Sequence, residues 1–197
     1  MKPIPHYIHP RKPKKKRSTF RILLWLTFLT LLTAAVLELM PIETVRHPKP
    51  VTGLHPEVAA KAYQLKEAGK QRGIAIRITD DFRSAAEQDA LYRKGRSEPG
   101  SIVTNVKGGH SYHNYGLAVD FALEMADGEI IWDLEYDGNG NGQADWMEIV
   151  TLAKGLGFSW GGDWKGFPDY PHLQMDFGLS IRELRQGKRP PMPAAEE

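Results

Sequence analysis

The stretch SYHNYGLAVDF, residues 111–121, joins a glycine bend to a short apolar strand. After Gly116, large apolar residues alternate with small or polar ones, as in a strand that buries one face. Such a strand would carry Asp120 back toward His113, which lies seven residues earlier. Histidine nitrogen and carboxylate oxygen are common zinc ligands, so this stretch is a candidate half of a metal site. Ordinary loops and strands also contain such pairs, and both interpretations stay open on this spacing alone.

A catalytic zinc site takes three protein ligands and leaves one position to water. The chain has seven histidines and no cysteine, so the third ligand would be another histidine or an oxygen. Four of the histidines fall in or beside the N-terminal segments described below: His6, His9, His47 and His55. Apart from His113 itself, His110 and His172 remain. His172 is favoured, because it begins a strand-like stretch and Asp169 precedes it by three residues. This second pair makes a metal site and a purely structural role about equally plausible.

Basic residues are concentrated at the N-terminus. Residues 1–21 contain eight Lys or Arg and no acidic residue. From residue 39 onward the chain contains 18 basic and 23 acidic residues. The small positive net charge therefore belongs to the N-terminal tail alone. We expect no nucleic-acid binding by the folded part.

Residues 22–37, ILLWLTFLTLLTAAVL, follow that tail and carry no charge. With Leu39 and Met40 the stretch approaches the ~20 residues that a spanning helix needs. Because the basic flank is N-terminal, the positive-inside rule places that end in the cytoplasm. We predict a basic cytoplasmic tail over 1–21 and a transmembrane signal anchor over 22–40. A cleaved signal peptide and a buried helix are the less favoured alternatives, since no good cleavage site follows.

The rest of the chain is predicted to be an α+β domain, in which helices pack on a small antiparallel sheet. The proline-rich segment 41–53 is typical of a linker, and residues 189–197 are predicted to be a disordered tail. Helices are expected over 55–73, 84–95 and 144–157, and strands over 74–78, 116–124, 129–133, 158–160 and 171–177. The second helix begins with a capping box, Ser84-x-x-Glu87. Residues 97–112 form a long loop of the kind that is either functional or disordered.

Four motifs in order resemble a known family of zinc peptidases: FRSAAEQDALYRKGR, GGHSYHNYGLAVDF, WGGDW and DYPHLQM. SYHNYGLAVD resembles the Ser-x-His-x-x-Gly-x-Ala-x-Asp signature of the VanY/VanX-type zinc D,D-peptidases. DYPHLQ resembles the second signature of that superfamily, an acidic residue three positions before a histidine. The context is most similar to the peptidoglycan L-alanyl–D-glutamate endopeptidases of the CwlK and phage endolysin type. The resemblance covers residues 54–188, which it identifies as a zinc peptidase domain.

The resemblance implies a role for each of seven residues. The zinc ligands would be His113, Asp120 and His172, the catalytic residues Asp169 and Arg83, and the substrate contacts Ser111 and Gln88. Zinc lowers the pKa of its bound water from 15.7 to about 7. Asp169 would act as the general base toward that water. Arg83 would face the oxyanion that forms in the transition state, and Gln88 could serve only to orient it.

A membrane-anchored zinc peptidase that cleaves the stem peptide of peptidoglycan, most favourably between L-Ala and D-Glu, is the implied function. Two alternatives stay open: a D-alanyl-D-alanine carboxypeptidase of VanY type, and a non-catalytic cell-wall-binding module. The complete set of ligands, base and Arg83 argues against the module. The expected partners are peptidoglycan and the membrane, with the C-terminal domain facing the cell wall. We expect a monomer.

The stretch DGNGNGQADWME, residues 137–148, fits the Asp-x-Asn-x-Asn-Gly-x5-Glu pattern of an EF-hand loop. The candidate calcium ligands are Asp137, Asn139, Asn141, Gln143 through its carbonyl, Asp145 and Glu148. The segment before the loop has a strand pattern, so the usual first helix would be missing. Three carboxylates and two amides suggest weak affinity, with a dissociation constant of about 10⁻⁴–10⁻³ M. An ion-free turn is the alternative.

Overall fold

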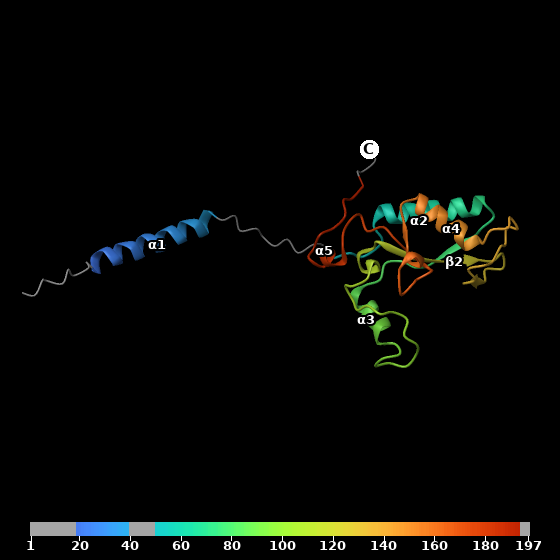
Figure 1. Ribbon diagram of the computed structural model, residues 1–197, viewed down its shortest axis with the longest axis horizontal. Helices are drawn as coiled ribbons and strands as arrows, with labels where there is room; N and C mark the ends of the chain where they lie inside the picture. The colour runs from blue at the N-terminus through green and yellow to red at the C-terminus, as the bar shows by residue number, and fades with distance from the viewer. Residues whose placement is uncertain (1–18, 40–49, 194–197) are drawn as a thin grey trace, which may run out of the picture. The chain divides into compact units, whose positions relative to one another are not determined.

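The computed structural model describes residues 19–39 and 50–193 (Figure 1). The chain divides into two compact units, Met1–Arg46 and His47–Glu197, and each is described by itself. Most of the predicted cytoplasmic tail and linker, and the end of the predicted C-terminal tail, lie outside the described residues.

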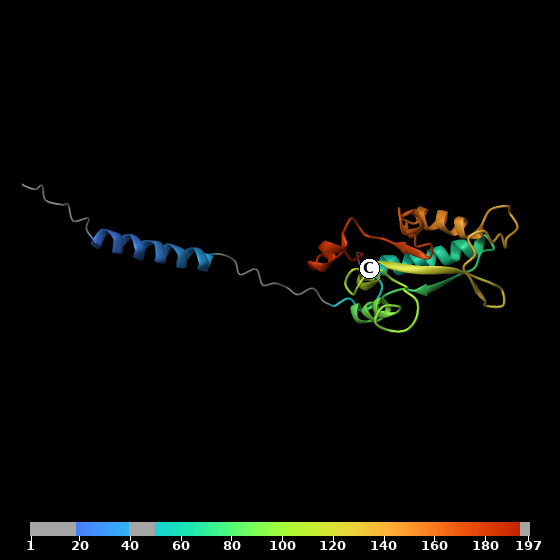
Figure 2. The ribbon, with the colours of Figure 1, turned by 60° about the horizontal axis from the view of Figure 1, so that its bottom comes forward.

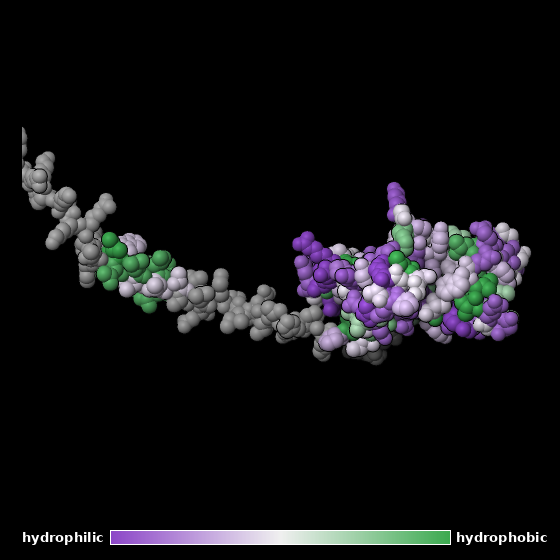
Figure 3. Space-filling view, turned by 90° about the horizontal axis from the view of Figure 1, so that it is seen from below, coloured by the Kyte–Doolittle hydropathy of each residue, from purple (hydrophilic) through white to green (hydrophobic). Residues whose placement is uncertain are grey.

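The N-terminal unit contains one described helix, α1 (Thr19–Leu39). Its large apolar side chains between Ile22 and Leu32 are exposed, and hydrophobic residues line the visible surface of the helix (Figure 3). Within residues 19–39 and 50–193, no helix combines the length and apolar character needed to cross a membrane.

The C-terminal unit is an α+β domain with a small antiparallel sheet, as predicted. Its elements, with η marking 3-10 helices, are α2 (Pro56–Gln71), β1 (Ile76–Asp80), α3 (Ala85–Arg93), η1 (Tyr112–Tyr115), β2 (Ala118–Glu124), β3 (Ile130–Ile131), α4 (Asp145–Gly155), β4 (Ser159–Trp160), η2 (Gly161–Asp163), β5 (His172–Gln174) and α5 (Ile181–Arg185). The strand order is β1-β2-β5-β4, and β3 pairs with the C-terminal end of β2. Helices α2 and α4 lie on one side of the sheet and α3 lies on the other (Figures 1 and 2).

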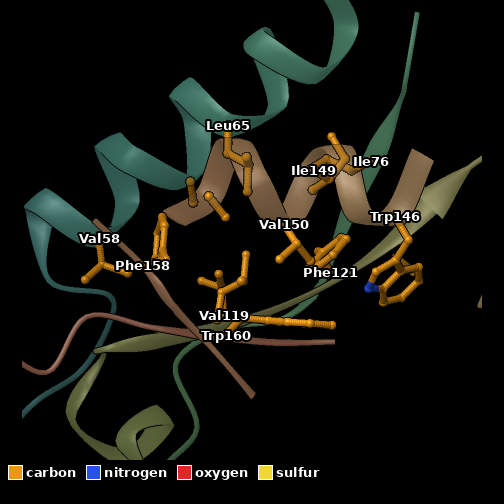
Figure 4. Close-up of a cluster of buried hydrophobic side chains, with 14 of the residues drawn as sticks. Val58, Leu65, Ile76, Val119, Phe121, Trp146, Ile149, Val150, Phe158 and Trp160 are labelled. Carbon is orange, nitrogen blue, oxygen red and sulfur yellow. The ribbon is translucent and has the colours of Figure 1, made fainter. Parts of the chain in front are cut away.

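Burial of apolar side chains between the sheet and the two helices forms the core. Val119 and Phe121 of β2 face Leu65 of α2 and Val150 of α4 (Figure 4). The helices approach closely at Gly69, where an added Cβ would lie 2.7 Å from Ile149 Cδ1. Strand β2 is buried along most of its length because helices cover one face and other segments cover part of the second. This strand is therefore the rigid centre of the domain.

Local sequence signals explain where the helices begin. Pro56 occupies the first turn of α2, and the His55 Nδ1 atom accepts a hydrogen bond from Glu57 N. The predicted capping box of α3 is confirmed: Ser84 Oγ accepts from Glu87 N at 3.2 Å, and the Glu87 carboxylate accepts from Ser84 N at 2.8 Å. Helix α3 ends at Arg93, slightly before the predicted boundary.

Residues 189–193, the described part of the predicted tail, contact the folded domain. His55 Nε2 donates to Pro191 O at 3.1 Å, since the other ring nitrogen already accepts a hydrogen bond. Arg189 Nη1 donates to Leu184 O at 2.8 Å, and its guanidinium lies over the Tyr115 ring. These contacts fasten the described part of the tail to the start of α2 and the end of α5.

The turn at Gly116 generates a stability prediction. Gly116 has φ 66°, and an added Cβ would overlap the Gly53 carbonyl oxygen and approach His55 N to 3.0 Å. We expect Gly116→Ala to lower the free energy of unfolding by about 2 kcal/mol or more, from left-handed strain plus the steric overlap. Urea unfolding measures this. Gly155→Ala is the control, because an added Cβ meets nothing within 4 Å and φ is not positive there; equal effects of the two changes would contradict the prediction.

Candidate active site

Three elements bring one ligand candidate each to a single point. His113 comes from η1, Asp120 from β2 and His172 from β5. In the sheet, Asp120 pairs directly with His172. The Ser111 hydroxyl caps η1 by accepting from His113 N, and Gly116 ends it in the left-handed conformation. The bend and strand predicted from residues 111–121 are therefore present, and they return Asp120 to His113.

The ligand atoms of this triad are in mutual contact. Asp120 Oδ1 lies 3.3 Å from both His113 Nε2 and His172 Nδ1, and the two ring nitrogens are 3.2 Å apart. Both histidines are buried. Among the described residues, these are the three His, Asp or Glu side chains whose ligand atoms all lie within 4.8 Å of one another.

The hydrogen bonds on the far side of each ring fix which nitrogen carries the proton. His113 Nδ1 lies 2.6 Å from Asp81 O, and His172 Nε2 lies 3.1 Å from Gln174 Oε1. Both partners are carbonyl oxygens, which only accept, so these two nitrogens are the N–H groups of the neutral rings. His113 Nε2 and His172 Nδ1 therefore present lone pairs to each other and to the carboxylate. Among the described residues, Asp120 Oδ1 is buried without a hydrogen-bond donor, and such an arrangement fits a bound cation.

The charges at the triad favour a positive ion in the same place. Burial alone would raise the pKa of Asp120, but hydrogen bonds and positive charge from His113 and His172, when protons occupy the nitrogens that face the carboxylate, outweigh burial and hold the pKa well below its ordinary value. Burial would lower the pKa of His113, yet the contact with Asp120 raises it. The site thus stabilises added positive charge, and a metal ion would compete with a proton for His113.

Asp169, the predicted general base, lines the same cavity as the triad. Burial raises the pKa of its carboxyl group, and the negative charge of Asp120 raises it further. Its backbone N donates to Gly161 O at 3.0 Å, and an added Cβ on Gly161 would meet the Asp169 backbone and its Cβ. A carboxylate with a raised pKa in this position is suited to taking up a proton and releasing it again.

A cavity of about 490 Å³ opens over these groups. The triad, Asp169, Arg83 and Ser111 line it. Residues 103–106, Trp164 and Phe167 also line it. The Trp164 ring centroid lies 5.0 Å from that of His172. The cavity is large enough for a segment of peptide, with the metal-binding atoms in its lining.

Arg83 is held rigidly at this cavity. Its guanidinium donates to the Asp80 carboxylate and, through Nη1, to Gln88 Oε1 at 2.8 Å. The Arg83 carbonyl accepts from Asn114 Nδ2 at 2.8 Å, which ties this segment to η1. The sequence analysis did not predict a role for Asp80, because the motif that contains Arg83, FRSAAEQ, begins two residues after Asp80.

Gln88 does not contact the cavity, contrary to the prediction that it binds substrate. Its side chain is fully buried, and besides accepting from Arg83 it donates to Thr104 Oγ1 at 3.1 Å and Val106 O at 2.9 Å. Both ends of the amide are used within the protein. Gln88 thus orients Arg83 and anchors the loop that lines the cavity.

Asp81 and Gln174, the two hydrogen-bond partners of the ligand histidines, were also missed. Asp81 acts through its backbone carbonyl, so no side-chain pattern could have indicated it. Gln174 follows His172 by two residues, and in a strand this spacing puts two side chains on one face. That alternation was the available signal.

In the EF-hand-like loop, the carboxylates of Asp137 and Glu148 accept hydrogen bonds from other residues of the loop. Asp137 accepts backbone hydrogen bonds from Gly140, Asn141 and Gly142. Glu148 Oε1 accepts from the side-chain amides of Asn139 at 3.0 Å and Asn141 at 2.7 Å.

Asp145 is the buried member of this loop. Its Oδ2 atom accepts from Gly138 N at 3.0 Å, whereas Oδ1 is buried with no partner. Burial raises the pKa of Asp145, and the charges of Asp137 and Glu148 add to this. Helix α4 follows as predicted, and Gln143 is exposed within the loop.

Comparison with known proteins agrees with this geometry. A family model described as D-alanyl-D-alanine carboxypeptidase matches residues 104–175. Over 122 residues the chain is 62% identical to the peptidoglycan L-alanyl-D-glutamate endopeptidase CwlK of Bacillus subtilis (strain 168), covering 62% of this chain and 73% of that protein. Over 128 residues it is 34% identical to the L-alanyl-D-glutamate peptidase of Listeria phage A118, covering 64% of this chain and 40% of that one.

Two solved structures are also similar. The L-Ala D-Glu endopeptidase ChiX of Serratia marcescens has a TM-score of 0.44 and 23% identity, over 72% of this chain and 92% of that one. The LD-carboxypeptidase LdcB has a TM-score of 0.47 and 21% identity, over 73% and 82%. The identity to CwlK extends over nearly three quarters of that protein, and it is this relationship that assigns the family. The chain belongs to the VanY/VanX-type zinc peptidase superfamily, in the family that includes CwlK.

Proposed function

We propose that this protein is a zinc-dependent endopeptidase that hydrolyses the L-Ala–D-Glu bond in the stem peptide of peptidoglycan. The observation that carries the proposal is the convergence of two imidazole lone pairs and a buried carboxylate oxygen in the lining of a peptide-sized cavity. The identity to CwlK supports the choice of bond.

In the proposed mechanism His113, Asp120 and His172 hold the zinc ion. Bound zinc supplies Lewis acidity toward a water molecule and the scissile carbonyl group. Asp169 takes the proton of the attacking water and returns it to the nitrogen of the leaving D-Glu, a role that its raised pKa supports. Arg83, held by Asp80 and Gln88, stabilises the negative charge that develops on the carbonyl oxygen.

A D-alanyl-D-alanine carboxypeptidase is the second candidate, because the matching family model carries that description. Both reactions use the same metal and base and differ only in which peptide bond is cleaved. A non-catalytic wall-binding module would need none of the triad, Asp169 or Arg83, and their joint presence at one cavity argues against it.

Digestion of purified peptidoglycan by the full chain tests the proposal. We expect new amino termini on D-Glu, and their loss when a chelator removes zinc. Asp169→Asn should lower the rate by about 10²–10⁴-fold, the usual contribution of a general acid–base group. The matched control is Asp163→Asn, whose side chain pairs with Lys154 on the surface at 2.7 Å. Release of free D-Ala without new D-Glu amino termini would favour the carboxypeptidase, and no cleavage by zinc-loaded protein would favour the module.

We also propose that the loop over residues 137–148 binds calcium and has a structural role. The spacing of its ligands matches an EF-hand loop, and two of its carboxylates, on Asp145 and Glu148, are buried. Within residues 19–39 and 50–193, Asp145 Oδ1 has no hydrogen-bond donor, and the one cation paired with Glu148 is Arg72, at 3.5 Å. A divalent cation would offset this concentration of negative charge.

Thermal unfolding of the zinc-loaded protein tests the calcium site. At about 10 mM calcium, roughly 100 times the tight end of the expected dissociation constants, binding should add about 2.7 kcal/mol. This corresponds to an increase in Tm of several degrees, which equal magnesium should not reproduce. Glu148→Gln should abolish the calcium-induced increase, and Glu135→Gln, at an exposed position, should keep it. A Tm that is independent of calcium would contradict the proposed calcium site.

Membrane anchoring remains a proposal that rests on the sequence. The uncharged stretch 22–37 and its basic N-terminal flank support a single-pass signal anchor over 22–40, with the peptidase domain over 54–188 facing the cell wall. The exposed apolar side chains of α1 are consistent with a lipid environment.

Cell fractionation tests the anchor. We expect the full chain to stay in the membrane fraction after a carbonate wash and to be digested by protease added from outside. Leu29→Arg should impair insertion, because arginine at the centre of a spanning helix costs about 2.5–3.5 kcal/mol. Leu29→Ile should behave as the wild type. Release of wild-type protein by the wash would contradict the anchor.

A further inference from the structure

The two ligand histidines use opposite ring nitrogens, and each is oriented by a different kind of acceptor. His113 turns Nε2 to the site, and its Nδ1 donates to the backbone carbonyl of Asp81 at 2.6 Å. His172 turns Nδ1 to the site, and its Nε2 donates to the side-chain carbonyl of Gln174 at 3.1 Å. Only the second of these acceptors can be removed by substituting a side chain.

Gln174 is placed for this role by the sheet. It lies two residues after His172 on β5, so both side chains leave the strand on the same face. Its backbone is held between Ala118 of β2 and Ser159 of β4. The side chains of Gln174 and His172 are both buried, and so is the hydrogen bond between them. The position of the Gln174 amide is therefore determined by the strand rather than by solvent.

If Nδ1 of His172 binds a cation, the tautomer of the ring and the orientation of the Gln174 amide are fixed together. Because Nδ1 must be free of hydrogen to bind a cation, Nε2 is protonated and needs an acceptor, which only Oε1 of the Gln174 amide can supply. The amide NH₂ group then points away from His172. Among the described residues it has no hydrogen-bond partner, and Gln174 lines the cavity.

We infer that Gln174 is a positioning residue of the metal site, which holds His172 in the Nε2–H form and fixes the ring so that Nδ1 faces the metal. This inference rests on the proposed zinc site and adds a determinant of its affinity. Without an acceptor at residue 174, binding of zinc to Nδ1 would leave a polarised, buried N–H group unpaired. Loss of such an outer partner typically weakens metal binding 10–100-fold.

Zinc competition between the full chain and a chromophoric chelator measures the effect directly. Gln174→Met preserves the size of the side chain but removes the acceptor, and we expect about 10–100-fold weaker zinc binding. Gln174→Glu keeps an acceptor and should keep or tighten the wild-type affinity. Gln64→Met, at an exposed position of α2, is the control for the chemical change itself. Circular dichroism and thermal unfolding of the zinc-free variants establish that they are folded.

NMR of the zinc-free wild type gives a readout that needs no substitution. Nitrogen-15 shifts should show His172 protonated on Nε2 at a pH where the ring is neutral, and the opposite tautomer would overturn the inference. Wild-type zinc affinity of Gln174→Met, or equal losses in Gln174→Met and Gln174→Glu, would also overturn it. If the wild type binds zinc tightly but releases no D-Glu amino termini, the proposed function fails while the role of Gln174 stands. A wild type that binds no zinc would overturn both.

Discussion

The pairing of β2 with β5 is the constraint on which the site depends. It sets Asp120 opposite His172 in the middle of the sheet. Side chains alternate along a strand, so a slip of one residue would turn the carboxylate away from the imidazole and carry Val119 out of the core. The apolar contacts of β2 with α2 and α4 exclude that slip. Hydrophobic packing on one face thus sets the geometry of the polar groups on the other.

The close grouping of the ligand atoms has an electrostatic cost. Lone pairs on two histidines and a carboxylate are pressed together without a hydrogen-bond donor between them. The chain is held in this state by backbone features: the left-handed turn at Gly116, and the approach of Asp169 to Gly161. A bound cation would remove this repulsion, because the two histidine nitrogens and the carboxylate oxygen converge on one point.

Much of this site could be predicted from sequence because its main residues lie within short motifs with their own local structure. His113 and Asp120 lie on either side of one bend and belong to the same short motif, and the capping box predicts the start of α3. The remainder depends on contacts between distant segments. Asp80 reaches Arg83 across a bend, the Asp81 carbonyl binds a ring 32 residues away, and Gln88 is buried by a loop that the sequence left undefined. Such contacts arise from packing, for which a local pattern carries no signal.

The backbone acceptor on His113 bears on how this site can change in evolution. Substitution of the Asp81 side chain would leave this acceptor in place, because the hydrogen bond to His113 uses the backbone carbonyl oxygen. The same short segment, however, also carries the Asp80 carboxylate, the Arg83 guanidinium and the Arg83 backbone hydrogen bonds with His113 and Asn114. Insertions or deletions there would displace a ligand and the arginine together. The segment is therefore tolerant of substitution at residue 81 yet intolerant of any change in its length.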